Sequence, residues 1–158
     1  MIVADSSALV LLARIGQLET LRALAGRVVV PIAVWEEVVV AQADAPGARE
    51  VAAQTWIEVR LVDAAVATPI LSVLGRGEAE AIALALREPQ ATLLLDDGRA
   101  RKLADRLGLA RIGTLGLLTK AKRAGLVPAV KPLVGQLQAN GMWIEPRIVA
   151  AILKEVGE

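Results

Sequence analysis

Short apolar runs that end in an acidic residue and lead directly into a helical pattern constrain the fold of this chain most. The clearest are Ile2-Val3-Ala4 before Asp5, and residues 91–95 before Asp96 and Asp97. Such runs indicate buried strands, and further strands are predicted at 27–30, 57–62 and 110–112. Strands that alternate with helices are typical of βαβ units. The sequence therefore predicts an α/β fold with a mostly parallel sheet of about five strands and helices on both faces.

The segments between these strands carry helical spacing of apolar residues. Ser6 or Ser7 is suited to cap the first helix, and the segment 64–74 stays open between helix and loop because Thr68-Pro69 interrupts it. The other expected helices cover residues 18–25, 32–42, 48–54, 78–87, 99–107, 114–124, 131–139 and a last stretch that starts at Glu145-Pro146.

Composition limits the chemistry. With 158 residues, 55% of them hydrophobic and 22% charged, the chain suits a single domain over residues 1–158 with C-terminal helices at about 129–158 packed on it. The chain has no cysteine and no histidine, which excludes disulfides, Cys/His zinc sites, thiol nucleophiles and imidazole bases. Acid–base or metal chemistry would have to use carboxylates, lysines, hydroxyl groups or the backbone.

The net charge of +1 gives no global argument for nucleic-acid binding, although a local basic patch stays open. The apolar stretches are short and no basic leader precedes them, so we expect no membrane span and a cytoplasmic location. Aromatic residues make up 2%, all of them tryptophan, which leaves little for base stacking.

Acidic residues follow two of the predicted strands. Because parallel strands bring their carboxyl ends to one edge of a sheet, Asp5 and the Asp96-Asp97 pair are expected close together. Clustered carboxylates raise one another's pKa unless a cation neutralises them, and their hard oxygens select Mg²⁺ or Mn²⁺. The alternative is that each aspartate only caps the helix that follows it.

Two predicted helices could add carboxylates to this edge. Glu36-Glu37 follows the second strand, and Glu78 and Glu80 open a long helix. Positions 78 and 80 point in nearly opposite directions on a helix, so only one of them can enter a site there. The alternative for each glutamate, taken singly, is a solvated helix face.

The order of several short motifs carries a resemblance. DSSAL (5–9), PxxVxxEV (31–38), GEAEAIALA (77–85), LLLDDxRAR (93–101) and GTLGLL (113–118) together resemble the PIN-domain ribonucleases, and more narrowly a VapC-like toxin branch with the GEAEA and GTLG segments. The resemblance covers nearly the whole chain. It implies a three-layer α/β/α domain, a site for Mg²⁺ or Mn²⁺, and cleavage of single-stranded RNA by metal-activated water.

The resemblance also implies roles for particular residues. The four catalytic and metal-binding acids would be Asp5, Glu37, Glu80 and Asp97, with Asp96 and Glu78 as neighbouring candidates and Ser6 and Thr114 as supporting hydroxyls. In this expectation Asp97 and Glu80 point inward, while Asp96 is peripheral. The third acid here is a glutamate where many relatives have aspartate, which puts the metal geometry in doubt.

RNA contact would fall to basic residues near the second acidic strand end, namely Arg76, Arg99, Arg101 and Lys102, with Arg106 further along the same helix. The alternative for them is a solvated helix face. Relatives of this kind are often homodimers held inactive by a small antitoxin protein, and we expect a homodimer through apolar surface on residues 18–25 and near Trp35.

Two other functions stay open at this stage. One is a PIN fold without catalysis that acts as an RNA- or protein-binding module. The other is a nucleotide- or phosphate-binding α/β protein, which the absence of a P-loop and of a GxGxxG motif after a strand disfavours.

Overall fold

The computed structural model describes residues 1–158, apart from the side chain of Ala64. A sheet in the order β3-β2-β1-β4-β5 forms its centre, and all neighbouring strands are parallel. The central strand β1 pairs with β2 on one side and with β4 on the other. The predicted α/β fold with five strands is confirmed. The strands are β1 (Ile2–Ala4), β2 (Val28–Pro31), β3 (Ile57–Arg60), β4 (Thr92–Leu94) and β5 (Arg111–Ile112).

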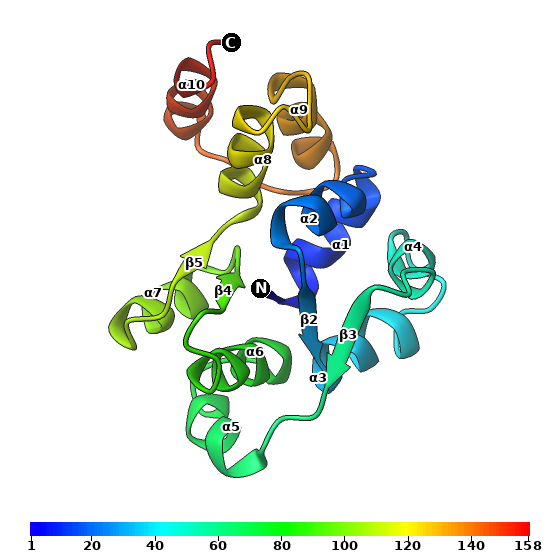
Figure 1. Ribbon diagram of the computed structural model, residues 1–158, viewed down its shortest axis with the longest axis vertical. Helices are drawn as coiled ribbons and strands as arrows, with labels where there is room; N and C mark the ends of the chain where they lie inside the picture. Colours follow the sequence, from blue (N-terminus) through cyan, green and yellow to red (C-terminus); the bar gives the residue numbers. More distant parts are fainter.

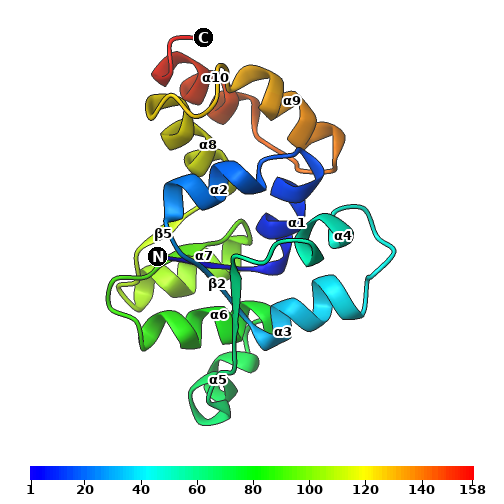
Figure 2. The same cartoon turned by 45° about the vertical axis from the view of Figure 1, so that its right-hand side comes forward.

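Helices cover both faces of the sheet (Figures 1 and 2). One layer holds α1 (Ser6–Arg14), α2 (Leu18–Ala25), α8 (Thr114–Arg123), α9 (Lys131–Ala139) and α10 (Pro146–Glu155). The opposite layer holds α5 (Ala64–Leu71), α6 (Arg76–Leu86) and α7 (Gly98–Arg106). The remaining helices follow β2: α3 (Ile32–Trp35), the π-helix η1 (Glu36–Val40) and α4 (Ala48–Ala52).

Alternate residues of the strands supply the two cores, because successive side chains of a strand point to opposite faces. Ile2, Val28 and Leu94 belong to the core beneath α1, α2 and α8. Val3 and Leu93 belong to the other core, beneath α6 and α7. Because helices bury both faces of the central part of the sheet, β1 and β2 are apolar throughout, whereas the edge strand β3 carries Glu58 and Arg60. Asp5 follows β1, and Asp96 follows β4, at the carboxyl edge of the sheet.

The segment after β2 differs from the single helix that the sequence predicts for residues 32–42. It begins as α3 and continues as the π-helix η1, in which the amide of Ala41 donates to the carbonyl of Glu36 at 2.8 Å. The wider π turn rotates the side chains that follow it relative to a regular helix. Of residues 64–74, left open by the sequence, Ala64–Leu71 form α5 with Pro69 inside it.

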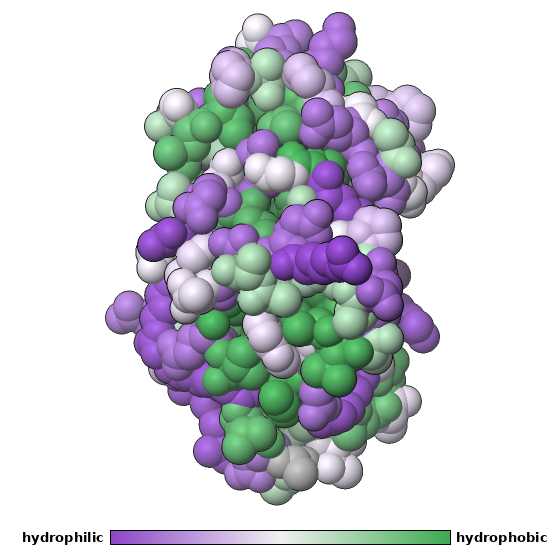
Figure 3. Space-filling view, turned by 90° about the vertical axis from the view of Figure 1, so that its right-hand side faces the viewer, coloured by the Kyte–Doolittle hydropathy of each residue, from purple (hydrophilic) through white to green (hydrophobic). Residues whose placement is uncertain are grey.

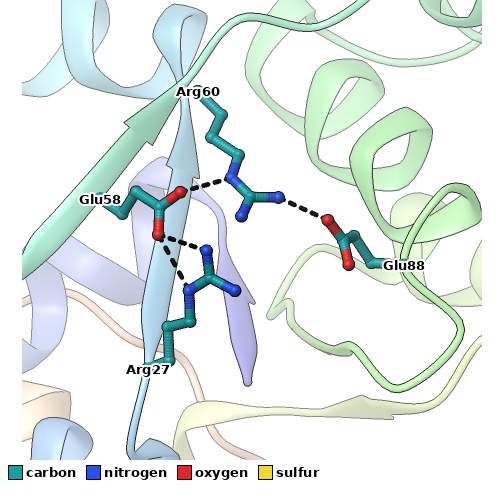
Figure 4. Close-up of polar contacts among 4 residues, drawn as sticks. All are labelled: Arg27, Glu58, Arg60 and Glu88. Carbon is teal, nitrogen blue, oxygen red and sulfur yellow. Dashed lines mark hydrogen bonds and ion pairs between the residues drawn. The ribbon is translucent and has the colours of Figure 1, made fainter.

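Strand β3 lies at one edge of the sheet and carries a chain of ion pairs (Figure 4). Glu58 accepts hydrogen bonds from Arg27 at 2.9 Å and from Arg60 at 2.5 Å, and Arg60 also pairs with Glu88. The arginines lower the pKa of the Glu58 carboxyl. These pairs link the start of β2, the edge strand and the end of α6.

Apolar side chains are exposed near the same edge. Figure 3 shows them gathered in the lower half of this face. The large exposed apolar residues of β3, of α5 and of the loops that follow them are Val59, Leu61, Leu71 and Val73. This differs from the expectation for α2, where Leu18 and Leu21 are buried and pack into the core. Trp35 is half-buried and packs against the same core.

The C-terminal helices pack on the first core. Leu133, Val134 and Leu137 of α9 are buried in it, and Ile152 of α10 packs against it. The last residue, Glu158, is attached to the start of α9, because its side chain accepts hydrogen bonds from the amides of Val130 and Lys131. No helix of the described residues has both the length and the apolar character needed to cross a membrane.

Candidate active site at the carboxyl edge of the sheet

Asp5 lies at the carboxyl end of β1 and caps α1. Its Oδ1 accepts from the amide of Ala8 at 2.9 Å, and its Oδ2 accepts from the Ser7 hydroxyl at 3.1 Å. The residue is only 1% exposed. The strand-then-helix sequence places it there, because Ala4 is the last strand residue and Ser6 the first helical one.

The electrostatics of Asp5 are those of a buried acid among other acids. Burial raises the pKa of Asp5 from 3.8 to about 7, the charges of Asp96 and Glu78 act in the same direction, and the hydrogen bonds from Ala8 and Ser7 act against it. Asp5 forms no ion pair among the described residues, and no cation is among the largest causes of this pKa. A group of this kind favours either a proton or a bound cation.

Glu37 reaches the same region from η1. Its Oε2 accepts a hydrogen bond from the Ser6 hydroxyl at 2.7 Å, so the carboxylate is held beside the start of α1. A Cβ atom on Gly77 would lie 3.2 Å from both Glu37 Oε2 and Ser6 Oγ. The glycine therefore allows the start of α6 to pack against this pair. Ser6 was expected to support the first acid; the structure gives that position to Ser7, and Ser6 holds Glu37.

Of the two glutamates on α6, Glu78 faces the acids. Its charge acts on Asp5, and it lines two adjoining hollows, one shared with Ser6 and both shared with Glu37. The side chain lies back over the start of the helix, with Oε2 only 2.6 Å from where a Cβ on Gly75 would be. A carboxylate is favoured at that end of a helix.

Glu80 has a different surrounding, which reverses the expected choice between the two glutamates. It is 8% exposed, its Oε2 accepts from the amide of Ala33 at 3.1 Å, and its Oε1 accepts from Arg76 Nε at 2.9 Å. The physical reason is the helical half-turn between positions 78 and 80: the face that packs on α3 takes Glu80, and this leaves Glu78 on the open face. Glu80 therefore joins α6 to the start of α3.

The Asp96-Asp97 pair is also arranged in the opposite way to the expectation. Asp97 caps α7, because its Oδ1 accepts from the amides of Arg99 at 2.9 Å and Ala100 at 2.8 Å. Asp96 accepts from the amide and the hydroxyl of Thr114, and its charge raises the pKa of Asp5. Thr114 is fully buried at the start of α8, so it supports Asp96 as a fixed hydroxyl.

The basic residues divide into two groups. Arg76 is held by two carboxylates, Glu36 at 2.8 Å and Glu80 at 2.9 Å. Arg99, Arg101 and Lys102 of α7 form no ion pair within the part of the chain that the structure describes. Arg101 is half-buried and lines a groove together with Asp96, whereas Arg99 and Lys102 are exposed.

Comparison with known proteins decides the family. A family model described as a PIN domain matches residues 1–158. The chain belongs to the PIN-domain family. Comparison with curated proteins and with solved structures gave no match. PIN domains are generally nucleases and typically use divalent metal ions.

The acids of this PIN domain suit such an ion by their chemistry. Asp5, Glu37, Glu78 and Asp96 come from four separate elements and offer only hard oxygen donors. Among the described residues no group of three ligand side chains already stands close enough to hold a metal ion. Mg²⁺ commonly takes only one or two carboxylates and keeps several waters, so the donor set fits without all four acids converging.

Proposed function

We propose that this PIN domain is a Mg²⁺- or Mn²⁺-dependent endoribonuclease that cleaves single-stranded RNA. The observation that carries the proposal is the buried Asp5, whose carboxyl has no cation partner among the described residues and feels the charges of two further acids. A buried carboxylate among other acids is electrostatically unfavourable, and a bound cation would stabilise its charged form.

In this proposal one or two of the acids Asp5, Glu37, Glu78 and Asp96 would bind the ion directly and the others would act through its waters. When bound, a divalent ion polarises the phosphodiester and lowers the pKa of water, which supplies a nucleophile without histidine. With a pKa of about 7, the Asp5 carboxyl is roughly half protonated at neutral pH, and it would have to be deprotonated to hold a cation. Ser6 orients Glu37 and Thr114 orients Asp96 through the hydrogen bonds described above.

The substrate would be held through its backbone. Arg99, Arg101 and Lys102 stand on α7 directly after Asp96 and Asp97, and their positive charges can bind phosphates of any sequence. Replacing them should weaken RNA binding for all sequences alike and flatten its salt dependence. If the dependence of RNA affinity on salt is unchanged, these residues do not bind phosphates and only form a solvated helix face. Arg76 is less suited, because two carboxylates already compensate its charge.

A nuclease assay tests the activity. Wild-type protein should cleave single-stranded RNA with Mn²⁺ and not with EDTA, and Asp5→Asn should lower the rate by on the order of 100-fold or more. Asp97→Asn is the matched control, since asparagine also caps helices and should keep most of the activity. Equal activity of wild type and Asp5→Asn would reject the mechanism.

A toxin role is the finer part of the proposal. In it the nuclease is the toxin of a toxin–antitoxin pair and a small antitoxin protein blocks the site. Induced expression of the wild type should then arrest growth, and co-expression of the neighbouring small gene should relieve the arrest. The alternative is a binding module without catalysis; it would bind RNA or protein equally well in EDTA and show no Mn²⁺-dependent cleavage.

A further inference from the structure

A groove runs from Asp96 to the segment between α9 and α10. Its volume is about 310 Å³, and α7, the start of α8 and residues 142–152 line it. Asp96, Arg101 and Trp143 are all among its lining residues. The groove is therefore continuous with the candidate active site.

Trp143 is unusual among the three tryptophans. It is 82% exposed, whereas Trp35 and Trp56 are half-buried. Trp56 donates a hydrogen bond to Gln54 and lies under the guanidinium of Arg22. The Trp143 indole has neither kind of partner among the described residues. An exposed and unpartnered indole leaves a large apolar face in water.

The backbone on both sides of Trp143 is fixed, so its exposure is not that of a loose loop. Ile144 is 6% exposed and belongs to the first core. The amide of Met142 donates to the carbonyl of Leu137 at 3.0 Å, and Pro146 begins α10. The chain thus presents the indole at the surface from an anchored position.

Arg101 supplies a positive charge in the same groove. Its Nη1 lies 3.5 Å from where a Cβ on Gly113 would be, and Asp96 Oδ1 lies 3.0 Å from the same point. No ion pair within the described residues occupies this guanidinium. Glu145, the other acid of the groove, is paired with Arg147 at 2.5 Å. The groove therefore offers a cation near the acids and an aromatic face.

We propose that this groove binds a nucleotide next to the cleaved phosphodiester, with the base stacked on Trp143 and the phosphate on Arg101. The inference rests on the proposed ribonuclease function and adds a subsite to it. Stacking on one indole accepts every base, so the subsite would position the strand without reading its sequence. Trp143 would thus provide base stacking in a chain of which only 2% is aromatic.

The experiment measures binding of a fluorescently labelled octauridine RNA by anisotropy in EDTA, where cleavage is absent. Trp143→Ala should weaken binding by about 5- to 150-fold, the range for loss of one stacked base. Trp143→Phe should stay close to wild type, because phenylalanine retains an aromatic face. Leu86→Ala, at a residue 42% exposed near the end of α6 in the opposite helix layer, is the control and should leave binding unchanged.

Two further readouts sharpen the test. RNA should quench the tryptophan fluorescence of the wild type much more than that of Trp143→Phe. Arg101→Ala should lower the slope of binding against salt by about one. Thermal melting of each variant checks that the fold is intact.

The outcomes separate the two proposals. Cleavage by wild type together with unchanged RNA binding by Trp143→Ala would overturn the subsite and leave the nuclease standing. Unchanged RNA binding with an altered oligomeric state of Trp143→Ala would assign the groove to a protein contact and also overturn the subsite. Wild-type protein that neither binds nor cleaves RNA would overturn both.

Discussion

Asp5 sets the chemistry of the site at the scale of single residues. Its carboxyl is buried, accepts two hydrogen bonds from its own helix and has other acids near it. These hydrogen bonds stabilise the charge but do not outweigh burial, so the pKa stays at about 7. The residue thus caps α1, and in the proposed function it would also bind the cation.

This pKa predicts how stability depends on pH. Between pH 4 and pH 7 the unfolded chain releases the Asp5 proton while the folded protein keeps it, so folding stability falls as pH rises. Because each pKa unit is worth about 1.4 kcal/mol, the change from 3.8 to about 7 corresponds to roughly 4 kcal/mol.

Asp5→Asn should remove this dependence, because asparagine does not titrate. Its Oδ1 can still accept from the amide of Ala8, while its NH2 group would donate to the Ser7 hydroxyl instead of accepting from it. In EDTA the variant should be more stable than wild type at pH 8, and the difference should shrink towards pH 4. Urea denaturation across this pH range measures it. A stability difference that does not change with pH would contradict the raised pKa.

At the scale of whole elements, packing between helices determines which acids act on Asp5. Helix α6 is turned by its packing on α3, where Glu80 binds the amide of Ala33. The turned helix directs Glu78 towards Asp5. Contacts with two helices likewise separate Asp96 from Asp97. Asp97 caps α7, and Thr114 at the start of α8 donates a hydrogen bond to Asp96.

The two glutamates of α6 should therefore respond differently to the same substitution. Glu78→Gln should lower the nuclease rate by on the order of 100-fold with little change in stability. Glu80→Gln should keep the rate and destabilise the fold by about 1–3 kcal/mol, because it weakens buried charge-assisted hydrogen bonds. Rates and urea midpoints of both variants test this, and the reverse pattern would restore Glu80 as the ligand.

Gly77 tests the packing of α6 against Glu37. Alanine adds a Cβ that would stand 3.2 Å from Glu37 Oε2 and Ser6 Oγ, so both must move by a few tenths of an ångström. Alanine also favours the helix by up to about 1 kcal/mol. We expect Gly77→Ala to change stability by less than about 1 kcal/mol and to lower activity about 10-fold. Gly135→Ala on α9, where a Cβ meets open space, is the control; equal activities would show that Glu37 need not be held in place.

The strand ends were predictable from the sequence because they depend on neighbouring residues. An apolar run before Asp5 or Asp96 indicates a buried strand, and parallel strands bring both to one edge. The choice between Asp96 and Asp97 depends on Thr114, 18 residues later, and the choice between Glu78 and Glu80 depends on Ala33, 47 residues earlier than Glu80. Neither of these long-range contacts can be predicted from the spacing of residues along the chain. The π-helix η1 likewise has no sequence pattern that distinguishes it from a regular helix.

At the scale of the whole molecule, the exposed apolar residues favour self-association. Val59 lies on β3 and Leu61 directly after it, at a sheet edge with one side unpaired, and Leu71 and Val73 at and after the end of α5 are exposed as well. Such an edge is a natural place for contact with a second copy. The expected homodimer remains a prediction, now at this surface instead of α2.

Light scattering at micromolar concentration should show a dimer for the wild type and a monomer for Leu61→Asp. Val40→Asp replaces another exposed apolar residue, on η1, and should leave the dimer intact. A monomeric wild type would contradict the dimer, and a dimer that survives Leu61→Asp would place the contact elsewhere.

The arrangement of acids at the carboxyl edge is the central claim, and anomalous diffraction from crystals grown with Mn²⁺ tests it most directly. We predict a single strong peak within coordination distance of an Asp5 oxygen and of at least one oxygen from Glu37, Glu78 or Asp96, with water completing the shell. Asp5→Asn crystals grown in the same way should lose the peak. A peak bound by Glu80 or Asp97 instead, or no peak at saturating Mn²⁺, would contradict the account.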